Sequence, residues 1–226
     1  MPLTWPSLKL DSMALATLSV CYIVKNEEML LEASLRSIET LAEEIIVVDT
    51  GSTDSTLQIA KKFSDRVESF KWCDDFSAAR NFCASLAKSD WILFIDGDEI
   101  LEENGEKEIR ETIEAGKDIS AFGVLQRNYT NDRSYPGWKP LPTEMDKNIS
   151  GFLKGISGFA DNFMMKLYRN HLGIVWEGVV HETIVGSCRK LGLQHLEIPA
   201  CILHHLNELK TEPFRNEKKS YYLKLA

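Results

Sequence analysis

The stretch WILFIDGDE, residues 91–99, decides how this sequence is expected to fold. Its first five residues are apolar, with β-branched and aromatic side chains among them, which predicts a β-strand buried on both faces. Three carboxylates, those of Asp96, Asp98 and Glu99, then follow around Gly97. An unpaired carboxylate is costly to bury, so we expect this cluster at the exit of the strand, facing water or a cation. Asp-Gly-Asp is also a hairpin-turn pattern, and a plain hairpin is the alternative.

The chain before this strand repeats one pattern, an apolar strand followed by a polar turn and an amphipathic helix. The expected strands cover residues 18–24, 44–48 and 67–72, and we expect Asn26 and Ser77 to cap the first and third helices. Strand–helix units of this length favour right-handed crossovers. We therefore predict an α/β fold with a Rossmann-like, mostly parallel sheet flanked by helices. The turns after its strands should share one edge, where open α/β sheets bind ligands.

The second half of the chain is less regular, and we expect it to form a smaller, mixed part of the fold. A solvated helix should end near Gly116, and residues 131–162 are rich in Pro, Gly and Asn. So long a connection within a domain is typical of a functional loop, and we predict that it is mobile and closes over a ligand. The strands expected here cover residues 120–129, 163–168, 173–176 and 196–204.

Composition excludes several classes of protein. The chain has 226 residues and a net charge of −8, which argues against nucleic-acid binding through a basic surface. Its five cysteines show no Cys-x-x-Cys spacing, so free thiols in a reducing compartment are expected. No signal peptide and no transmembrane segment is recognisable. We therefore expect a cytoplasmic protein, and peripheral contact with the inner face of the membrane stays open.

Familiar nucleotide and zinc motifs are absent from the sequence. Neither Gly-x-x-x-x-Gly-Lys nor Gly-x-Gly-x-x-Gly follows the first expected strand, which argues against P-loop NTPases and dinucleotide oxidoreductases. The pair His181 and Glu182 does not complete His-Glu-x-x-His, because residue 185 is valine. Binding chemistry must therefore come from the turns of the predicted sheet.

Four side chains in these turns could together hold a nucleoside diphosphate. Asp49 follows the second strand and could accept a hydrogen bond from a base or ribose, or merely cap its own turn. Arg80 offers a planar fork to a diphosphate, or pairs weakly with an aspartate of the preceding turn. Asp96 and Asp98 supply hard oxygen ligands of the kind that Mg²⁺ and Mn²⁺ prefer.

These motifs resemble the family 2 inverting glycosyltransferases of the GT-A fold. The resemblance rests on four segments in the family's order: the strand and turn at 18–27, IIVVDTGSTDST at 45–56, FSAARN at 76–81 and IDGDE at 95–99. Two later segments, WEGVVHE at 176–182 and ILHHL at 202–206, are similar to one branch of that family. This branch includes lipopolysaccharide-core glucosyltransferases and bacterial enzymes with tetratricopeptide repeats, among them peptide S-glycosyltransferases.

The resemblance implies metal-assisted transfer of a hexosyl group from a nucleotide-sugar, foremost a UDP-sugar, to an acceptor nucleophile with inversion. The acceptor would be a glycan, a lipid-linked sugar or a peptide. The residues that it implies are Val24, Lys25 and Asp49 near the base, Arg80 and Gly97 near the diphosphate, and Asp96 and Asp98 on Mn²⁺ or Mg²⁺. Asp98 counts as catalytic, because the ion that it holds would stabilise the departing diphosphate.

The acceptor side of the expected site is carried by later residues. Glu182 is our candidate general base, because it follows an expected strand on the far side of the fold beside His181. A plain solvated glutamate is the alternative. His205 is a candidate further metal ligand, against a structural histidine held by hydrogen bonds. Thr50 stands where many relatives have a second acidic residue, so altered base recognition is expected.

The resemblance also divides the chain into expected parts. These are an irregular extension over 1–16, a nucleotide-sugar-binding half over 17–130, an acceptor-side half over 131–211 and the start of a C-terminal helix over 212–226. We expect that last helix to continue in a longer protein.

Three other functions are alternatives to glycosyl transfer. A nucleotidyltransferase needs a Gly-rich basic loop after its first strand, and residues 24–27 form no such loop. An aspartyl phosphatase carries Asp-x-Asp on its first strand, whereas here it follows the fourth. A sugar-nucleotide-binding module or an inactive catalytic fragment would keep the binding residues without turnover.

Overall fold

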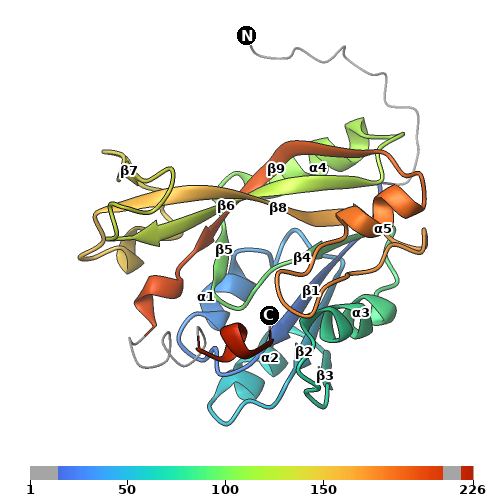
Figure 1. The fold of residues 1–226 in the computed structure, drawn as a ribbon, viewed down its shortest axis with the longest axis horizontal. Coiled ribbons are helices and arrows are strands. Elements are labelled where there is room, and N and C mark those ends of the chain that lie inside the picture. The colour runs from blue at the N-terminus through green and yellow to red at the C-terminus, as the bar shows by residue number, and fades with distance from the viewer. Residues whose placement is uncertain (1–14, 211–219, 226) are drawn as a thin grey trace.

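The computed structural model describes residues 15–210 and 220–225 and folds them around one sheet (Figure 1). The sheet runs in the order β3-β2-β1-β4-β8-β6-β9-β5, and β7 pairs with β8 beside this path. Its strands are β1 (Leu18–Val24), β2 (Glu44–Asp49), β3 (Arg66–Ser69), β4 (Trp91–Phe94), β5 (Glu99–Leu101), β6 (Ala121–Thr130), β7 (Lys139–Pro140), β8 (Gly158–Arg169) and β9 (His195–His205).

Helices flank the sheet, as the sequence pattern predicts. They are α1 (Leu31–Arg36), α2 (Thr56–Phe63), α3 (Phe76–Leu86), α4 (Gly105–Ala115) and α5 (Val185–Lys190), with short 3₁₀ turns η1 (Ser150–Phe152) and η2 (Asn207–Leu209). Among the described residues, no helix is long and apolar enough to cross a membrane. Most of the expected extension over 1–16 and of the expected helix over 212–226 lies outside the described residues, although 220–225 are helical.

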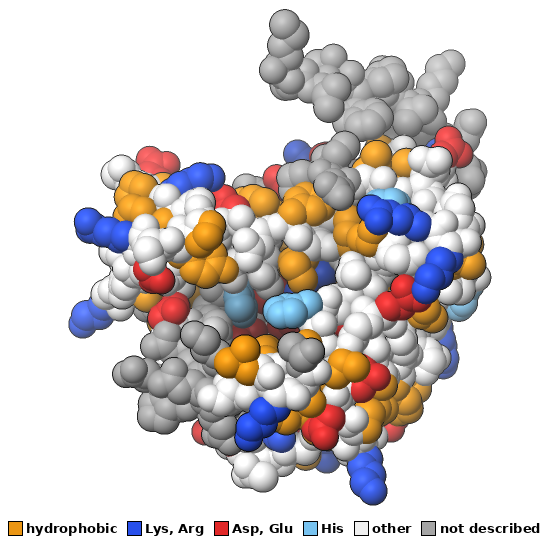
Figure 2. All heavy atoms as spheres, in the orientation of Figure 1, with side chains coloured by type: hydrophobic (Ala, Val, Ile, Leu, Met, Phe, Trp, Pro, Cys, Tyr) orange, Lys and Arg blue, Asp and Glu red, His pale blue; other side chains and the backbone are white. Residues whose placement is uncertain are grey.

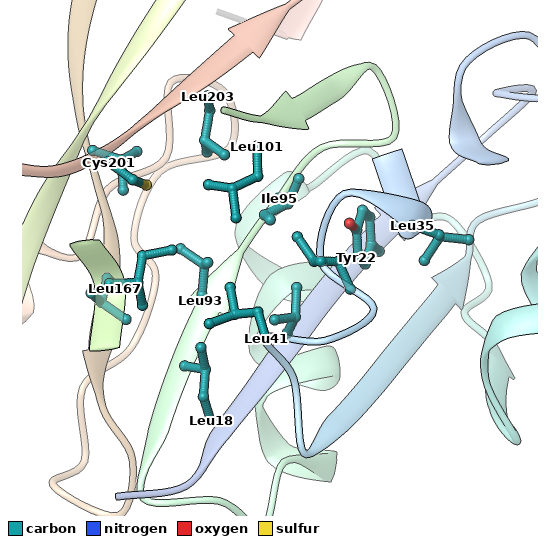
Figure 3. Packing of buried hydrophobic residues seen from close by; sticks show 14 of the residues in the cluster. Leu18, Tyr22, Leu35, Leu41, Leu93, Ile95, Leu101, Leu167, Cys201 and Leu203 are labelled. Atoms are coloured by element: carbon teal, nitrogen blue, oxygen red, sulfur yellow. The ribbon is translucent and has the colours of Figure 1, made fainter. Parts of the chain in front are cut away.

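The first half of the sheet is parallel, and its strands β1 and β4 are buried on both faces. β1 pairs in parallel with β2 and β4, and β2 pairs in parallel with β3. Leu18 and Tyr22 of β1 pack with Leu35 of α1 on one face (Figure 3), while Cys21 packs with Cys83 of α3 on the other. The α/β prediction is therefore confirmed. All five cysteines are free thiols, as expected.

The hairpin reading of residues 96–98 is wrong. β4 ends at Phe94, and the turn after it leads into β5, which pairs with β9 and not with β4. Glu99 lies opposite His205 in that pairing. The acidic turn therefore connects the parallel half of the sheet to the second half, instead of folding back beside its own strand.

The second half of the sheet is mixed. β8 runs antiparallel to β4 and β6, while β9 runs parallel to β6. β8 begins at Gly158, so the connection after β6 spans 131–157 and not 131–162 as expected. Ile149 and Leu153 of this connection are buried with Tyr129 in a small apolar cluster. Its mobility stays a prediction.

The strand expected at 173–176 is absent from the structure. Asn81 of α3 replaces a neighbouring strand, because its amide donates to the Trp176 carbonyl at 2.9 Å and accepts from the Trp176 N–H at 2.8 Å. Gly173 has a positive φ of 77°, which turns the chain out of β8. This segment is therefore fixed to a helix and brings Trp176 into the core.

Two expected helix caps are also different in the structure. Asp75 caps α3 by accepting from Ala78 N at 3.0 Å, so the cap is not Ser77. Asn26 has a positive φ of 56° and accepts from Thr53 N at 2.8 Å, so it joins two turns instead of capping α1. Asx side chains serve both purposes, and sequence spacing alone did not separate them.

The β5–β9 junction contains a carboxyl group whose ionisation should affect stability. Glu102 accepts from Ile202 N at 2.6 Å. Burial, together with the nearby Glu108, raises the pKa of Glu102 to about 7. Its pKa in the unfolded chain is about 4.3. The folded state therefore holds a proton that the unfolded state releases between these values, and stability falls as pH rises through this window.

We expect Glu102→Gln to remove this loss, because glutamine can still accept the Ile202 hydrogen bond without a charge. The free energy of unfolding of the variant, minus that of the wild type, should be about 1 kcal/mol higher at pH 8 than at pH 5. This figure allows for solvent screening of a half-exposed group. Urea unfolding at both pH values measures this, with Glu103→Gln at the exposed neighbouring position as control. Equal differences at the two pH values would contradict the assignment.

Candidate functional site

The turns after β1 and β2 meet at one edge of the sheet, as expected. Val24 lies in register with Asp49, and the Val24 carbonyl accepts from Thr50 N at 3.0 Å. The Asp49 carboxylate accepts from Gly51 N at 3.0 Å and from Ser52 N at 3.1 Å, so the capping contact is real. Lys25 is exposed beside them. The three residues predicted for the base side are therefore neighbours.

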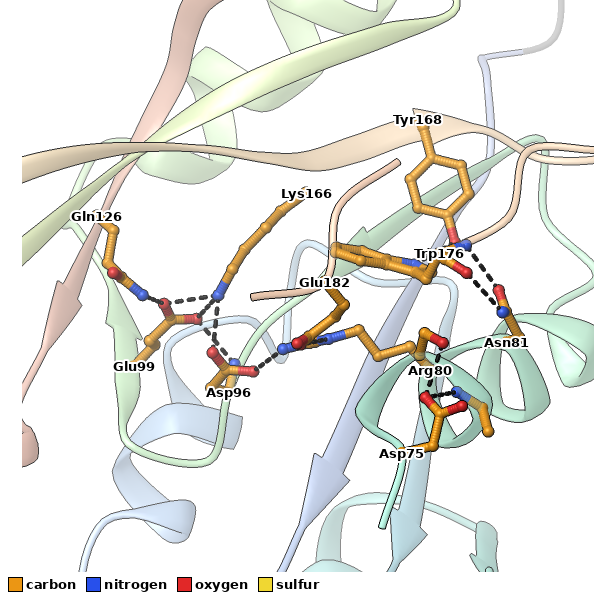
Figure 4. Close-up of polar contacts among 12 residues, drawn as sticks. Asp75, Arg80, Asn81, Asp96, Glu99, Gln126, Lys166, Tyr168, Trp176 and Glu182 are labelled. Atoms are coloured by element: carbon orange, nitrogen blue, oxygen red, sulfur yellow. Dashed lines mark hydrogen bonds and ion pairs between the residues drawn. The ribbon is translucent and has the colours of Figure 1, made fainter. Parts of the chain in front are cut away.

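Arg80 joins two of the predicted site residues that are far apart in the sequence (Figure 4). Its Nη2 donates to Asp96 Oδ1 at 2.9 Å, and its Nε donates to Glu182 Oε1 at 2.6 Å. The Arg80 side chain is 7% exposed and that of Glu182 is 11% exposed. Neither the surface pairing considered for Arg80 nor the solvated alternative for Glu182 holds. The metal-side carboxylate and the candidate base share one guanidinium.

Aromatic rings hold the Arg80 guanidinium in place. Its central carbon lies 5.2 Å from the centre of the Phe94 ring and 4.8 Å from that of Trp176. Such contacts are favourable for a cation. Burial alone would lower the pKa of Arg80, but Asp96 and Glu182 more than offset this and raise it. Arg80 Nη1 is buried without a hydrogen-bond partner among the described residues.

Lys166 of β8 is a second cation beside Asp96, so negative and positive side chains alternate from Glu182 through Arg80 and Asp96 to Lys166. Its Nζ donates to Asp96 Oδ2 at 2.9 Å and to both Glu99 oxygens at 2.7 Å. Gln126 of β6 also donates to Glu99, at 2.6 Å. Burial opposes ionisation of Asp96, yet Lys166 and Arg80 more than offset it and lower its pKa. Both oxygens of Asp96 are therefore held by cationic side chains.

Lys166 and Gln126 were not expected in the site, and Glu99, expected only as part of the acidic cluster at the exit of the strand, is fully buried. A signal was present, because Lys166 interrupts the apolar run FMMKLY in an expected strand. A lysine at such a position is rarely buried unless it is paired. Its partners lie 67 and 70 positions away, however, and only the pairing of β4 with β8 brings them together.

Asp98 lies in a second group of charged side chains. Its Oδ2 is 2.6 Å from Lys210 Nζ and 3.5 Å from His205 Nε2. Lys210 also contacts Glu27 Oε1 at 2.7 Å. A Cβ at position 97 would approach Glu27 Cγ to 2.8 Å, so Gly97 lets this side chain pack against the turn. Lys210 and Glu27 carried no sequence signal for this role.

His205 is oriented toward Asp98 by its other ring nitrogen. His205 Nδ1 donates to Asn128 Oδ1 at 2.6 Å, which directs Nε2 at the carboxylate. Burial opposes protonation of this ring, but the Asp98 carboxylate more than offsets it and raises the His205 pKa. A hydrogen bond of this kind on the second nitrogen is usual for a metal-binding histidine.

The residues present fit a metal ion that takes few ligands from the protein and the rest from phosphate and water oxygens. No three His, Cys, Asp or Glu side chains in the described part of the chain are arranged to enclose an ion. Asp98 and His205 do converge, and the Lys210 ammonium marks a position that suits a cation. Mg²⁺ is usually held by one or two carboxylates together with phosphate and water oxygens.

Figure 2 shows a hollow at the centre of this face, with histidine side chains at its border and acidic side chains at its floor. The side chains of the site are themselves largely buried, since those of Arg80, Glu182 and Asp98 are 7%, 11% and 3% exposed.

A sequence model of glycosyl transferase family 2 matches residues 19–171, and the chain belongs to this family. The similarity to solved structures is consistent with the GT-A fold. Glucosyl-3-phosphoglycerate synthase from Mycobacterium tuberculosis superposes with a TM-score of 0.55 at 18% identity, over 89% of this chain and 74% of that one.

Two curated relatives show how the match is distributed. A TPR repeat-containing protein of Synechococcus elongatus is 41% identical over 113 residues, which is 50% of this chain and 28% of that protein. An uncharacterized glycosyltransferase of Rickettsia bellii is 30% identical over 147 residues, which is 62% of this chain and 49% of that protein. The chain thus spans half or less of the length of these relatives.

Proposed function

We propose that this domain transfers a hexosyl group from a UDP-sugar to an acceptor nucleophile with inversion, assisted by Mn²⁺ or Mg²⁺. The observation that carries the proposal is the connected row Glu182–Arg80–Asp96 beside Asp98 and His205, at the edge where the strands end. Structures of the similar glucosyl-3-phosphoglycerate synthase contain UDP with Mg²⁺ or with Mn²⁺. These ligands support the proposed donor and ion.

Asp98 Oδ2 and His205 Nε2 are the groups that would hold the ion. Bound there, it would neutralise charge on the departing diphosphate. Asp96 was expected to be a ligand as well, but both its oxygens are bound to Arg80 and Lys166. We assign Asp96 the role of keeping the Arg80 guanidinium beside the diphosphate, where its charge favours departure.

Val24, Lys25 and Asp49 are proposed to receive the nucleotide base. The Asp49 carboxylate already accepts two backbone hydrogen bonds. A carboxylate has about four lone-pair sites, so it can accept one more from the base. The backbone contacts would keep its oxygens fixed when the nucleotide arrives.

Glu182 is proposed as the general base that deprotonates the acceptor. Inversion by a single displacement needs one base and a stabilised leaving group. The contact of Glu182 with Arg80 fixes this carboxylate at the edge of the site. Base catalysis typically contributes about 10²–10⁴ in rate, so a Glu182→Gln variant that transfers sugar at the wild-type rate would exclude this role. The acceptor class stays a glycan, a lipid-linked sugar or a peptide.

Thermal unfolding and product release together test the proposed function. UDP with Mn²⁺ should raise the Tm more than either alone, because ligands of the native state stabilise it. UDP-sugars should then release UDP slowly in the absence of acceptor. Binding without release from any UDP-sugar or acceptor would favour the binding-module alternative. A Tm unchanged by every nucleotide would contradict both.

A further inference from the structure

Lys210 lies where the proposed ion would bind. Its Nζ is 2.6 Å from Asp98 Oδ2 and 2.7 Å from Glu27 Oε1. His205 Nε2 is 3.5 Å from the same Asp98 oxygen. The side chains of Lys210 and Asp98 are 7% and 3% exposed. One buried oxygen therefore faces both an ammonium group and the imidazole nitrogen proposed as a metal ligand.

We infer that Lys210 is a built-in competitor of the divalent ion and sets how tightly the site binds metal in the absence of nucleotide; this rests on the proposed function. An ion on Asp98 would lie about 2.0–2.2 Å from its oxygen. An ammonium at hydrogen-bond distance from that oxygen would be strongly repelled by the ion in so shielded a place. Metal binding therefore has to move the Lys210 amine away from Asp98.

The local backbone allows this exchange without unfolding. Leu206 N donates to the Asp98 carbonyl at 3.0 Å, and Lys210 N donates to the Asn207 carbonyl at 3.1 Å. The first bond holds the start of η2 against the acidic turn, and the second closes η2 itself, both through main-chain atoms. The lysine amine is attached by a flexible four-carbon stem. Nζ can therefore leave Asp98 by side-chain rotation while the segment keeps its place.

The exchange would couple the ion to the nucleotide. An ammonium displaced from Asp98 loses a buried partner, and a diphosphate arriving with the ion can replace that partner. Metal alone brings no anion to take the place of Asp98, although Glu27 stays beside the ammonium. Two ligands that each favour the same rearrangement bind cooperatively, and the coupling is reciprocal. The wild type should therefore bind Mn²⁺ weakly alone and more tightly with UDP.

A titration followed by the electron paramagnetic resonance of free Mn²⁺ tests this directly. Lys210→Gln removes the competing charge and should bind Mn²⁺ about tenfold more tightly than the wild type without nucleotide. The increase in Mn²⁺ affinity caused by UDP should shrink by a similar factor. Mn²⁺ alone should also raise the Tm of the variant more than that of the wild type.

Matched variants separate competition from a general change of charge or fold. Lys210→Arg keeps the positive charge and should bind Mn²⁺ as weakly as the wild type. Lys190→Gln removes a lysine that is 71% exposed and paired with Glu177 at 2.6 Å, and should change nothing. Lys210→Met keeps the apolar stem and serves as a second variant where glutamine does not fold.

The possible results distinguish this inference from the proposed function. Equal Mn²⁺ affinity in the wild type, Lys210→Gln and Lys210→Met, with UDP-dependent Mn²⁺ binding intact, would overturn the role of Lys210 alone. Absence of Mn²⁺ binding from every protein, with and without UDP, would overturn both proposals. Tighter Mn²⁺ binding by Lys210→Gln, with no sugar transfer by the wild type, would support competition and contradict the enzymatic function.

Discussion

Lys166→Met is expected to lower the free energy of unfolding by about 3–5 kcal/mol, the usual effect of removing one partner from a buried ion pair. The Lys166 side chain is 1% exposed and that of Glu99 is fully buried. Methionine has a similar length but leaves the Glu99 and Asp96 carboxylates without their ammonium partner. Denaturant unfolding at pH 7 measures the change.

Lys139→Met is the matched control for this loss. Lys139 pairs with Asp161 on the same sheet, but at 3.4 Å and with 61% of its side chain exposed. An exposed pair of this kind contributes about 0–1 kcal/mol. Adding Glu99→Gln to Lys166→Met should recover part of the stability, because one stranded charge is then removed. A loss no larger than that of the control would refute the buried-pair account.

Asp98→Asn is expected to reduce sugar transfer about 10²–10³-fold, the usual effect of removing one group that stabilises charge in the transition state. Asparagine keeps the shape of Asp98, and the main-chain bond to Leu206 does not depend on the side chain. Lys210 also keeps its contact with Glu27, so the folded structure should persist while the negative oxygen facing His205 is lost. Initial rates over a range of Mn²⁺ concentrations measure the effect.

The Asp118→Asn variant provides the comparison, because this aspartate is exposed and lies outside the site. It should transfer sugar at the wild-type rate. Circular dichroism and the Tm establish that both variants are folded. If Asp98→Asn kept more than about a tenth of the wild-type turnover at every Mn²⁺ concentration, Asp98 would have no part in charge stabilisation.

The donor half of the fold could be predicted because each of its strands and helices is specified by residues that are close together in the sequence. Apolar runs followed by turns and helices identified β1, β2 and β4, and parallel pairing places their turns at one edge. The positions of Asp49 and Asp96 at that edge follow from the same pattern. Burial on both faces also makes such strands easy to recognise, since nearly every residue is apolar.

The partners within the site could not be predicted, because they depend on pairings between distant segments. Glu182 reaches Arg80 from a turn with two positive φ angles, at Gly178 and His181, which strand and helix patterns do not foresee. Lys210 reaches Asp98 across 112 positions of sequence. The wrong strand at 173–176 has the same origin, because its backbone is hydrogen-bonded by the side chains of Asn81 and Ser187 and not by a neighbouring strand.

The single guanidinium between Asp96 and Glu182 has an evolutionary consequence. Either carboxylate, if lost alone, leaves Arg80 with one carboxylate partner in a buried place, and loss of Arg80 takes this partner from Glu182 and leaves Asp96 with Lys166. Mutations at these three positions should therefore be strongly non-additive. We expect positions 80, 96 and 182 to covary among homologues, so that a lineage that abandons the glutamate also replaces the arginine.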